Sequence, residues 1–457
     1  MGEHTHTLDE LRDGRGIVVT IEGYGFTGEG FVRIEDGWLS VRGAMPGERV
    51  RVRVEPGQPQ RTRRLFAEVL DVLEESPERR DAMCTHARRC RGCHIRHVSV
   101  EEEQRFKASA VRETLERYAG LEPDEIPEVR TIAAAPAERG DAERIRSALT
   151  YTRRDERVQL GLVVPGSDEL VPMAECPALA SSAQRCIARV ATALEECAPS
   201  APSGAGGLRA VRVAAPEHGR GFVVLVGDAH TSKEALQEVA QAVGVRVGES
   251  VGVFTQRGGE PEHVMGPERT RLELAGVSVE VTPRDWFHAT LRPAQALYEE
   301  LLSALQLHEE HALLDAGCGA GTIGLMCAPY VRAVWGFDVE RGRVERATYN
   351  AARSRFGHVE FVAGSWEGAL RRATVDGRRF ERATINPMRE PLGRRAMAMV
   401  DALVTERLVY LGPSPVSTAR DVGVLVELGW GVEQAAAANL HPATYHVMSV
   451  VTMVRRA

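Results

Sequence analysis

The chain has 457 residues, of which 43% are hydrophobic and 26% are charged, a composition typical of a globular protein with roughly two to four domains. The net charge of −7 argues against a uniformly basic coat for nucleic acid, although a local basic patch is enough for phosphate contact. Residues 1–15 are polar and acidic, and no apolar run is long enough to cross a bilayer. We therefore expect a cytoplasmic protein with no secretory signal and no membrane contact.

Residues 17–54 are rich in β-branched side chains and glycines, which is typical of a small antiparallel barrel. Residues 49–54 alternate arginine with valine, and this places the arginines on one face of a strand and the valines in the core. The face that carries Arg51 and Arg53 is either a solvated strand face or a contact for RNA. The sequence leaves both readings open.

The rest of the chain divides into two patterns. Residues 123–285 mix short strands and helices, interrupted at 199–207 by a stretch of Pro, Ser, Ala and Gly that is typical of a linker or long surface loop. From residue 293 onward helical and strand patterns alternate, which predicts a doubly wound α/β domain with a parallel sheet. The expected helices span 100–119, 293–307, 321–328 and 343–355, and the expected strands span 312–316 and 333–338.

Cys84, Cys90 and Cys93 form a C-x5-C-x2-C run, and Cys176 follows much later. Structural zinc sites usually show two close cysteine pairs, whereas this run has one, so the spacing favours an iron–sulfur cluster held by four cysteines. A disulfide framework is not expected in a cytosolic chain of this length. Zinc and coincidence remain as alternatives.

Residues 313–322 read as a strand that ends in a glycine-rich turn and opens a helix. Gly317, Gly319 and Gly321 allow the backbone to approach a ligand closely, and the start of the helix offers free N–H groups. Asp338 ends the next strand, where a carboxylate can accept hydrogen bonds from ribose hydroxyls. The pattern predicts a nucleotide-containing cofactor. A dinucleotide is possible, but the spacing Asp-x-Gly-x-Gly-x-Gly resembles the class I turn for S-adenosylmethionine (SAM).

Residues 410–421, YLGPSPVSTARD, closely resemble a loop of the RNA uracil-5-methyltransferases, which reads Tyr-Val-Ser-Cys-Asn-Pro-Ala-Thr-Leu-Ala-Arg-Asp. The cysteine run is similar to that family's cluster loop, and the glycines at 25–30 with the Pro-Gly-Glu corner at 46–48 resemble the TRAM barrel, an RNA-binding module. The resemblance covers almost the whole chain. It implies a TRAM-like, OB-like β-barrel over 1–75, a central α+β domain with the iron–sulfur loop over 76–285, and a class I SAM methyltransferase (Rossmann-like) domain over 286–457.

The resemblance also implies ligands and their contacts. A [4Fe–4S] cluster would be held by Cys84, Cys90, Cys93 and Cys176. The positions that correspond to SAM contacts are His288, Gly317, Gly319, Gly321, Thr322, Asp338, Ser365 and Asn386. His288 replaces a glutamine of the family, and Gly317 replaces an aromatic residue. The expected contacts for structured rRNA or tRNA are Arg51, Arg53, Arg88, Arg91, Phe287 and Arg389. The arginines of the cysteine loop could equally balance the negative charge of a cluster. We expect no DNA partner, and a monomer.

The catalytic positions of the family are altered in this chain. Methylation of uracil at C5 needs a thiolate that adds to C6 and a base that later removes the C5 proton. Pro413 stands at the thiolate position and Met448 at the base position, so neither catalytic group is present. Asn386 replaces the aspartate of an Asp-Pro-Pro-Arg stretch, whereas Arg389 keeps its arginine. We therefore expect uracil-C5 catalysis to be lost.

Three hypotheses follow from this pattern. The first is an RNA-binding relative of the family that keeps SAM and the cluster but has lost thiolate catalysis. The second is a working RNA methyltransferase that targets a ring nitrogen, an exocyclic amine or a 2′-hydroxyl, none of which needs a covalent cysteine. The third is an iron–sulfur regulator that no longer binds RNA.

Overall fold

The computed structural model describes residues 16–35, 37–55, 63–132, 144–154, 157–197, 207–216 and 220–456. The polar N-terminal segment 1–15 and most of the expected linker at 199–207 lie outside these residues. The chain forms two compact units: Met1–Ala110 with His441–His446, and Val111–Leu440 with Val447–Ala457. These units cut across the three segments expected from the sequence, and that division stays a prediction. Among the described residues, no helix is long and apolar enough to span a membrane.

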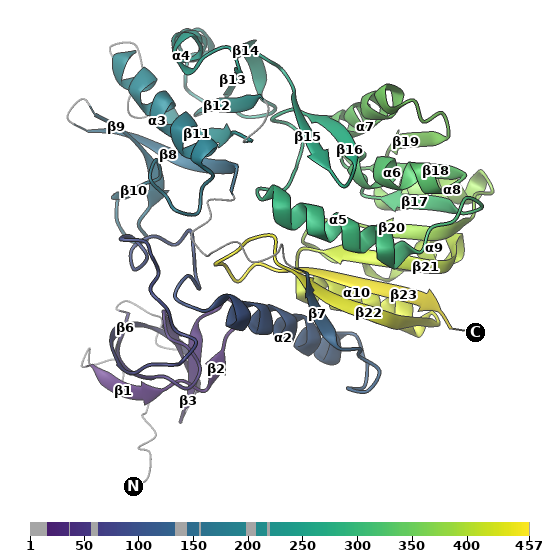
Figure 1. Cartoon of the computed structure of the whole chain (residues 1–457), viewed down its shortest axis with the longest axis horizontal. Coiled ribbons are helices and arrows are strands. Elements are labelled where there is room, and N and C mark those ends of the chain that lie inside the picture. Colours follow the sequence, from purple (N-terminus) through teal and green to yellow (C-terminus); the bar gives the residue numbers. More distant parts are fainter. Residues whose placement is uncertain are drawn as a thin grey trace. The chain divides into compact units, whose positions relative to one another are not determined.

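The first unit is built on a six-stranded sheet in the order β1-β5-β6-β4-β3-β2. Its strands are β1 (Ile17–Thr20), β2 (Gly23–Tyr24), β3 (Gly30–Ile34), β4 (Gly37–Arg42), β5 (Arg49–Val54) and β6 (Arg64–Glu74). In β5 every valine is buried and every arginine is exposed, as the alternation predicted. The curled sheet in Figure 1 is compatible with the expected barrel, although a closed barrel stays a prediction.

A second feature of the first unit is a loop contributed by the far end of the chain. Residues 441–446 pack with the cysteine loop and with the start of α2 (Val100–Tyr118). The backbone N–H groups of His94 and Ile95 both donate to the Ala443 carbonyl, at 3.0 and 3.2 Å. This loop directly precedes the strand that carries Met448, so a terminal segment of the chain belongs to the N-terminal unit.

The second unit contains a seven-stranded sheet in the order β10-β9-β8-β11-β12-β13-β14. Its elements are β8 (Arg146–Arg154), β9 (Arg157–Val163), β10 (Leu170–Pro172), α3 (Ser181–Glu196), β11 (Leu208–Ala214), β12 (Gly221–Gly227), α4 (Lys233–Val247), β13 (Val251–Gln256) and β14 (Glu262–Met265). Helices α3 and α4 cover one face of this sheet, and apolar side chains of both layers form one buried cluster (Figure 1). The mixture of short strands and helices expected for this region is therefore present.

The second unit also contains an eight-stranded sheet in the order β19-β18-β17-β20-β21-β23-β22-β7. Its strands are β7 (Val129–Ile132), β17 (Ala312–Ala316), β18 (Ala333–Asp338), β19 (Val359–Ala363), β20 (Phe380–Ile385), β21 (Val404–Gly412), β22 (Trp430–Ala438) and β23 (Met448–Arg455). Strands β17 to β21 run parallel, and β23 is antiparallel to its two neighbours. The doubly wound domain is confirmed, and both expected strands match β17 and β18.

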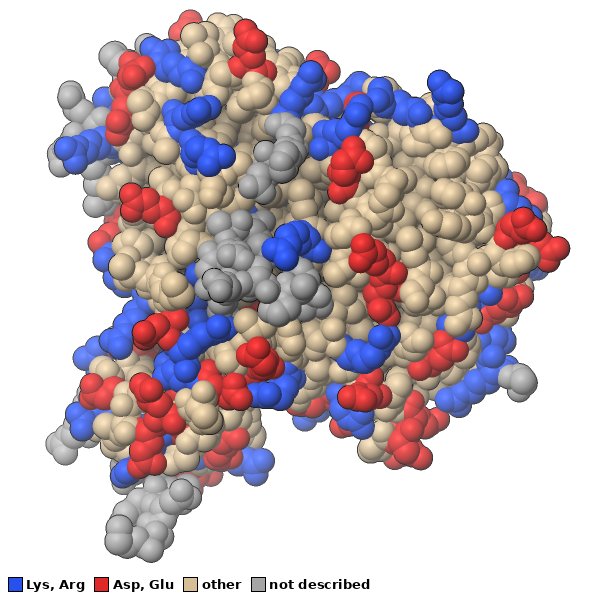
Figure 2. Space-filling view, viewed as in Figure 1, with Lys and Arg blue, Asp and Glu red and all other residues tan. Residues whose placement is uncertain are grey.

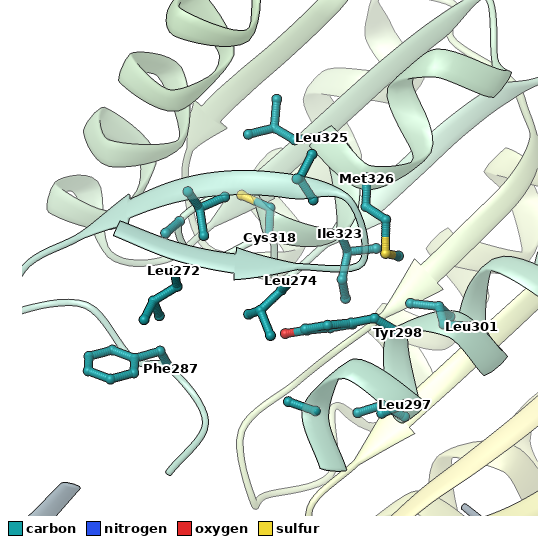
Figure 3. Packing of buried hydrophobic residues seen from close by; sticks show 14 of the residues in the cluster. Leu272, Leu274, Phe287, Leu297, Tyr298, Leu301, Cys318, Ile323, Leu325 and Met326 are labelled. Atoms are coloured by element: carbon teal, nitrogen blue, oxygen red, sulfur yellow. The ribbon is translucent and has the colours of Figure 1, made fainter. Parts of the chain in front are cut away.

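Helices and a hairpin complete the second unit around this sheet. They are β15 (Thr270–Leu274), β16 (Val277–Val281), α5 (Leu291–Leu305), α6 (Thr322–Cys327), the 3-10 turn η1 (Ala328–Tyr330), α7 (Arg341–Ser354), α8 (Trp366–Val375), α9 (Gly393–Leu403) and α10 (Pro415–Glu427). Figure 3 shows Leu274 of β15 and Ile323 of α6 packed against the ring of Tyr298 in α5. The hairpin therefore shares one buried core with the helices next to the glycine-rich turn.

Candidate functional site

The glycine-rich turn lies at the carboxyl end of β17, where the strand order reverses between β18 and β20. Ligands of open α/β sheets bind at such a switch point. Gly317, Gly319 and Gly321 all have positive φ angles, of 83°, 55° and 87°. A Cβ atom on Gly317 would lie 2.3 Å from the carbonyl oxygen of Asn386, so this position accepts only glycine. The aromatic residue that the family has at this position does not fit here.

Asp315, the last polar residue of β17, supports the turn from below. One carboxylate oxygen accepts from the Gly324 N–H at 2.8 Å, and the other accepts from the Thr384 hydroxyl at 2.9 Å. Burial raises the pKa of Asp315 to about 6, and its hydrogen bonds partly offset that rise. Asp315 therefore ties β17, α6 and β20 together directly beneath the expected cofactor.

Asp338 occupies the position expected for a ribose-binding acid. Its carboxylate accepts from the Gly319 N–H at 3.0 Å and from the Glu340 N–H at 2.9 Å, and Arg343 lies 3.5 Å away. A carboxylate has about four acceptor positions, so the two backbone bonds leave capacity for ligand hydroxyls. The acid thus orients the turn and remains suited to a ribose.

The remaining expected cofactor residues have more varied surroundings. Ser365 is the N-cap of α8 and accepts from the Gly368 N–H at 3.2 Å, Thr322 is the first residue of α6, and the Asn386 N–H donates to the Ala316 carbonyl at 2.9 Å. His288 is buried, with its ring centroid 4.6 Å from that of Trp286 and 5.7 Å from that of Tyr298. These residues occupy loops and helix starts around the turn, apart from His288, which packs with aromatic side chains.

Trp366 is a residue at this site that the sequence analysis missed. Its ring lies 5.0 Å from the Phe337 ring, edge to face, and its Cζ2 atom would lie 3.4 Å from a Cβ atom on Gly317. The indole therefore borders the turn and offers a flat apolar surface beside it. The sequence signal that could have identified Trp366 is an aromatic residue directly after Ser365, the N-cap residue of α8 that follows β19.

The positions of the missing nucleophile and base lie next to each other. Strands β21 and β23 are paired antiparallel with Gly412 opposite Ser449. Pro413 follows Gly412 and Met448 precedes Ser449, so the two positions stand opposite each other at the same end of the strands. Met448 is only 8% exposed and joins the hydrophobic core. The proline side chain has no nucleophilic atom, and the methionine thioether accepts no proton at neutral pH.

Hydrogen bonds of polar side chains near Pro413 fix the backbone of the neighbouring loops. The Tyr410 hydroxyl donates to Asp421 at 2.6 Å, and burial raises the pKa of Tyr410 well above its usual value. Asp421 also accepts from the Leu392 and Gly393 N–H groups at 2.7 and 2.8 Å, which fixes the start of α9. Arg389 is exposed, and its carbonyl accepts from the Ser417 hydroxyl at 2.6 Å. The 386–389 turn and the start of α10 are therefore joined.

Two thiols of this unit lie near the turn and are poorly suited to replace the missing nucleophile. Cys318 follows Gly317, and Cys327 ends α6; both are buried. Burial raises the pKa of each thiol well above its usual range, which suppresses the reactive thiolate.

The cysteines expected to hold a cluster are divided between the two units. Cys84, Cys90 and Cys93 lie on a turn-rich loop of the first unit, and the Gly92 N–H points at the Cys90 sulfur at 3.4 Å. Cys176 belongs to the second unit. Within the described residues, no group of three or more His, Cys, Asp or Glu side chains is arranged to hold a metal ion. The four-cysteine ligand set stays a prediction.

Four of the five basic residues expected to contact RNA are exposed on the first unit, and the fifth, Arg389, is exposed on the second. Arg51 pairs with Asp71 at 3.1 Å, Arg53 with Glu68 at 2.6 Å, and Arg91 lies 3.9 Å from Glu55. Arg88 is exposed on the cysteine loop, whereas the neighbouring Arg96 is buried and donates to the Ala82 carbonyl at 2.6 Å. Figure 2 likewise shows acidic and basic side chains interspersed on the face in view.

Comparisons with known proteins agree with this architecture. Residues 307–392 match the model of a family described as "Methyltransferase domain". The chain is 27% identical over 442 residues to a 23S rRNA (uracil(1939)-C(5))-methyltransferase of Klebsiella pneumoniae, with 96% of each chain covered. It is 26% identical over 462 residues to an uncharacterised RNA methyltransferase of Streptococcus agalactiae, covering 96% of this chain and 98% of the relative.

Among solved structures, the chain is similar to the Pyrococcus abyssi tRNA (uracil-54, C5)-methyltransferase in complex with S-adenosyl-L-homocysteine. The TM-score is 0.74 at 20% identity, and the match covers 96% of this chain and 99% of the other. That likeness concerns the fold, while the sequence matches extend over nearly the same length. The chain is therefore a relative of the RNA uracil-5-methyltransferases, similar to them in sequence along nearly its whole length and alike in fold.

Proposed function

We propose that this protein binds RNA and SAM as the RNA uracil-5-methyltransferases do, but has lost methylation at uracil C5. The observation that carries the proposal is the pairing of Pro413 with Met448 at adjacent strand ends. The two positions keep the neighbourhood that a nucleophile and a base need, and both hold residues without the required chemistry.

The chemical reason is that C5 of a neutral uracil is a weak nucleophile. A thiolate that adds to C6 turns C5 into an enolate carbon able to attack a methyl group, and a base must then remove the C5 proton. Proline supplies no attacking atom, and a methionine thioether takes no proton near neutral pH. Without both steps the C5 route has no low-energy path.

SAM binding is supported by the surroundings of the turn. Gly317 permits the close approach of two loops, Asp315 fixes the turn, and Asp338 presents a carboxylate beside it. SAM supplies a transferable methyl group when bound. The chain's own groups orient the nucleoside part of such a ligand.

The deciding experiment is a nucleoside analysis. The purified protein is incubated with SAM carrying a labelled methyl group and with total RNA, and the digested nucleosides are identified by mass spectrometry. We expect RNA and SAM to bind without labelled 5-methyluridine. Labelled 5-methyluridine that depends on the protein would refute the proposal, and label in another nucleoside would support a methyltransferase with a different target atom.

A rescue variant tests the chemical explanation. The triple variant Pro413→Cys, Met448→Glu and Asn386→Asp restores the thiolate, the base and the acidic position together. We expect it to gain 5-methyluridine formation. The matched control, with Pro413→Ala in place of Pro413→Cys, should remain inactive because it lacks an attacking atom.

We further propose a [4Fe–4S] cluster on Cys84, Cys90, Cys93 and Cys176. Its support is the spacing of the first three residues on one loop and the backbone N–H directed at the Cys90 sulfur. Protein purified without oxygen should be brown and contain about four iron and four sulfide per chain, in line with the cluster type. Colourless protein with zinc would overturn this part.

A further inference from the structure

Two arginines of the seven-stranded sheet have an unusual electrostatic setting. Arg146 on β8 stands opposite Ala214 on β11, and Arg212 on β11 stands opposite Ala148. Directly opposed residues of an antiparallel pair share a face, so the arginines are diagonal neighbours on one face, on the order of 7 Å apart. Two permanent positive charges are thus held close together.

No acidic side chain among the described residues forms an ion pair with Arg146 or Arg212. Arg146 donates to the Phe287 carbonyl at 2.5 Å and stacks over the Phe287 ring with its Cζ 4.6 Å from the centroid. Arg212 donates to the side-chain oxygen of Gln256 at 2.5 Å. Among the described residues neither guanidinium forms an ion pair with a carboxylate, and the Nε atom of Arg212 is buried with no hydrogen-bond partner.

Holding two positive charges close together in a partly buried place destabilises the folded protein when no anion is bound. Burial, and then the charge of Arg212, lower the pKa of Arg146, which shows that the environment disfavours the cation. An arginine cannot lose its proton in a protein, so the penalty persists. A guanidinium group can bind phosphate through two parallel N–H donors.

Part of the face that carries the two arginines is exposed. On the far side of the sheet, α3 and α4 bury Leu149, Val211 and Val213. On the arginine side, the neighbours Ala148 and Ala210 are small, and both are at least partly exposed. The two charges therefore lie between small, at least partly exposed side chains on β8 and β11 and the buried Phe222 and Val224 of β12.

The face also connects directly to the expected RNA-contacting segment. The Ile145 N–H donates to the Ala289 carbonyl at 2.8 Å, and Arg146 holds the carbonyl of Phe287. The Thr290 hydroxyl in turn donates to the Leu440 carbonyl at 2.6 Å, at the end of the chain segment that follows β22. A ligand bound at the arginines would lie next to the Phe287–Thr290 segment.

We propose that Arg146 and Arg212 form a binding site for a phosphodiester of the RNA, beside the Phe287–Thr290 segment. This inference rests on the proposed function and adds a specific anchor for the RNA backbone in the second unit. The non-bridging oxygens of one phosphodiester would accept from the terminal N–H groups of both guanidinium groups.

The test measures the affinity of the full-length protein for a fluorescent RNA stem–loop with a uridine in the loop, by anisotropy at several salt concentrations. Arg212→Gln should weaken binding about tenfold at low salt and reduce the slope of log Kd against log salt by about 0.7 to 0.9. Arg212→Lys keeps the positive charge but lacks the paired N–H donors of a guanidinium group. Its affinity for RNA should therefore lie between those of the wild type and Arg212→Gln. Arg209→Gln is the matched control, since Arg209 lies on the same strand but is exposed and paired with Asp228 at 2.9 Å.

Two further readouts separate the site from other roles. The affinity for SAM, measured by calorimetry, should be unchanged in Arg212→Gln; a loss of SAM affinity with RNA affinity unchanged would assign the arginines to the cofactor carboxylate and overturn the proposal. The melting temperature of Arg212→Gln should not fall, because the variant removes a like-charge repulsion. A lower melting temperature with wild-type RNA affinity would show a structural role only.

The outcome also distinguishes this inference from the proposed function. If the wild-type protein binds the stem–loop and Arg212→Gln binds equally well with the same salt slope, the phosphate site alone is refuted. If the wild-type protein binds no RNA, both the proposed function and the phosphate site at Arg146 and Arg212 are refuted.

Discussion

Gly317 lies where two loops of the eight-stranded sheet approach each other closely. Its backbone has a φ angle of 83°, and the space for a side chain is filled by the Asn386 carbonyl. The neighbouring Gly319 also has a positive φ angle but has open space around it. At the residue scale, the turn therefore depends on one glycine for packing and on another for backbone conformation only.

This difference predicts unequal effects of two alanine substitutions. Gly319→Ala should cost about 1 kcal/mol of stability, the usual penalty for a left-handed alanine. Gly317→Ala should cost clearly more and should abolish SAM binding, because the loop after β20 must move. Urea unfolding and calorimetric titration with SAM measure both effects, and equal losses in the two variants would contradict the packing argument.

Asp315 predicts a pH dependence. Its pKa of about 6 lies above the ordinary value of 3.8, so the folded protein holds this proton more tightly than the unfolded chain does. The stabilisation is fully present below about pH 4 and is lost as the pH rises through 6, a change of up to about 3 kcal/mol. The unfolding free energy of the wild type minus that of Asp315→Asn should fall by this amount from pH 4 to 7, because the asparagine does not titrate. A difference that does not vary with pH would contradict the raised pKa of Asp315.

At the scale of elements, helix α2 binds the loop 441–446 of the first unit through a buried ion pair. Lys107 is 0% exposed and donates to Glu103 at 2.9 Å and to the His441 carbonyl at 3.2 Å. Glu103 accepts from the Ala443 N–H at 2.9 Å, and Ala443 itself has a φ angle of 61°. The loop conformation therefore relies on two charged side chains of one helix.

Removal of the ammonium group should be costly. Lys107→Met deprives the buried Glu103 carboxylate of this partner, and we expect a loss of about 3 to 5 kcal/mol in urea unfolding. Adding Glu103→Gln should recover part of the loss, since the amide oxygen still accepts from Ala443.

The same helix supplies the control. Arg112 pairs with Glu116 at 3.0 Å with both side chains 38% exposed, and it also donates to the Pro123 carbonyl at 2.9 Å and to the Ile126 carbonyl at 3.4 Å. Arg112→Met should therefore cost about 1 to 2 kcal/mol, less than Lys107→Met. Equal costs for Lys107→Met and Arg112→Met would show that burial of the Lys107 pair contributes nothing.

At the scale of the whole molecule, the eight-stranded sheet is completed by residues from far earlier in the chain. Strand β7 pairs in parallel with β22, with Val129 opposite Ala435 and Ile132 opposite Ala438. Gly423 of α10 lies so close to Ala119 that a Cβ atom would be 3.0 to 3.2 Å from the Ala119 backbone. The segment 286–457 is therefore incomplete on its own.

A fragment of residues 286–457 should accordingly aggregate. It leaves the buried alanines of β22 at an open sheet edge, which is a template for pairing between chains. Light scattering should show large particles for the fragment and a uniform species for the full-length chain. A fragment that unfolds cooperatively at the same urea concentration as the full chain would contradict the role of β7.

The sequence by itself determined the local features. The buried runs of β17 and β18, the alternation in β5, and the glycine turn with its following acid were all predictable, because they depend on side-chain period and backbone freedom over a few residues. The absence of a nucleophile at Pro413 was equally readable, since it is a matter of side-chain chemistry.

Only the tertiary structure decided which distant residues meet. The pairing that sets Pro413 opposite Met448, the addition of β7 to β22, and the juxtaposition of Arg146 with Arg212 all arise from strand pairing between segments far apart in sequence. Trp366 was missed for the same reason, because only the fold brings its ring to Gly317. Such contacts are fixed by the packing of the whole sheet and leave no periodic signal in the local sequence.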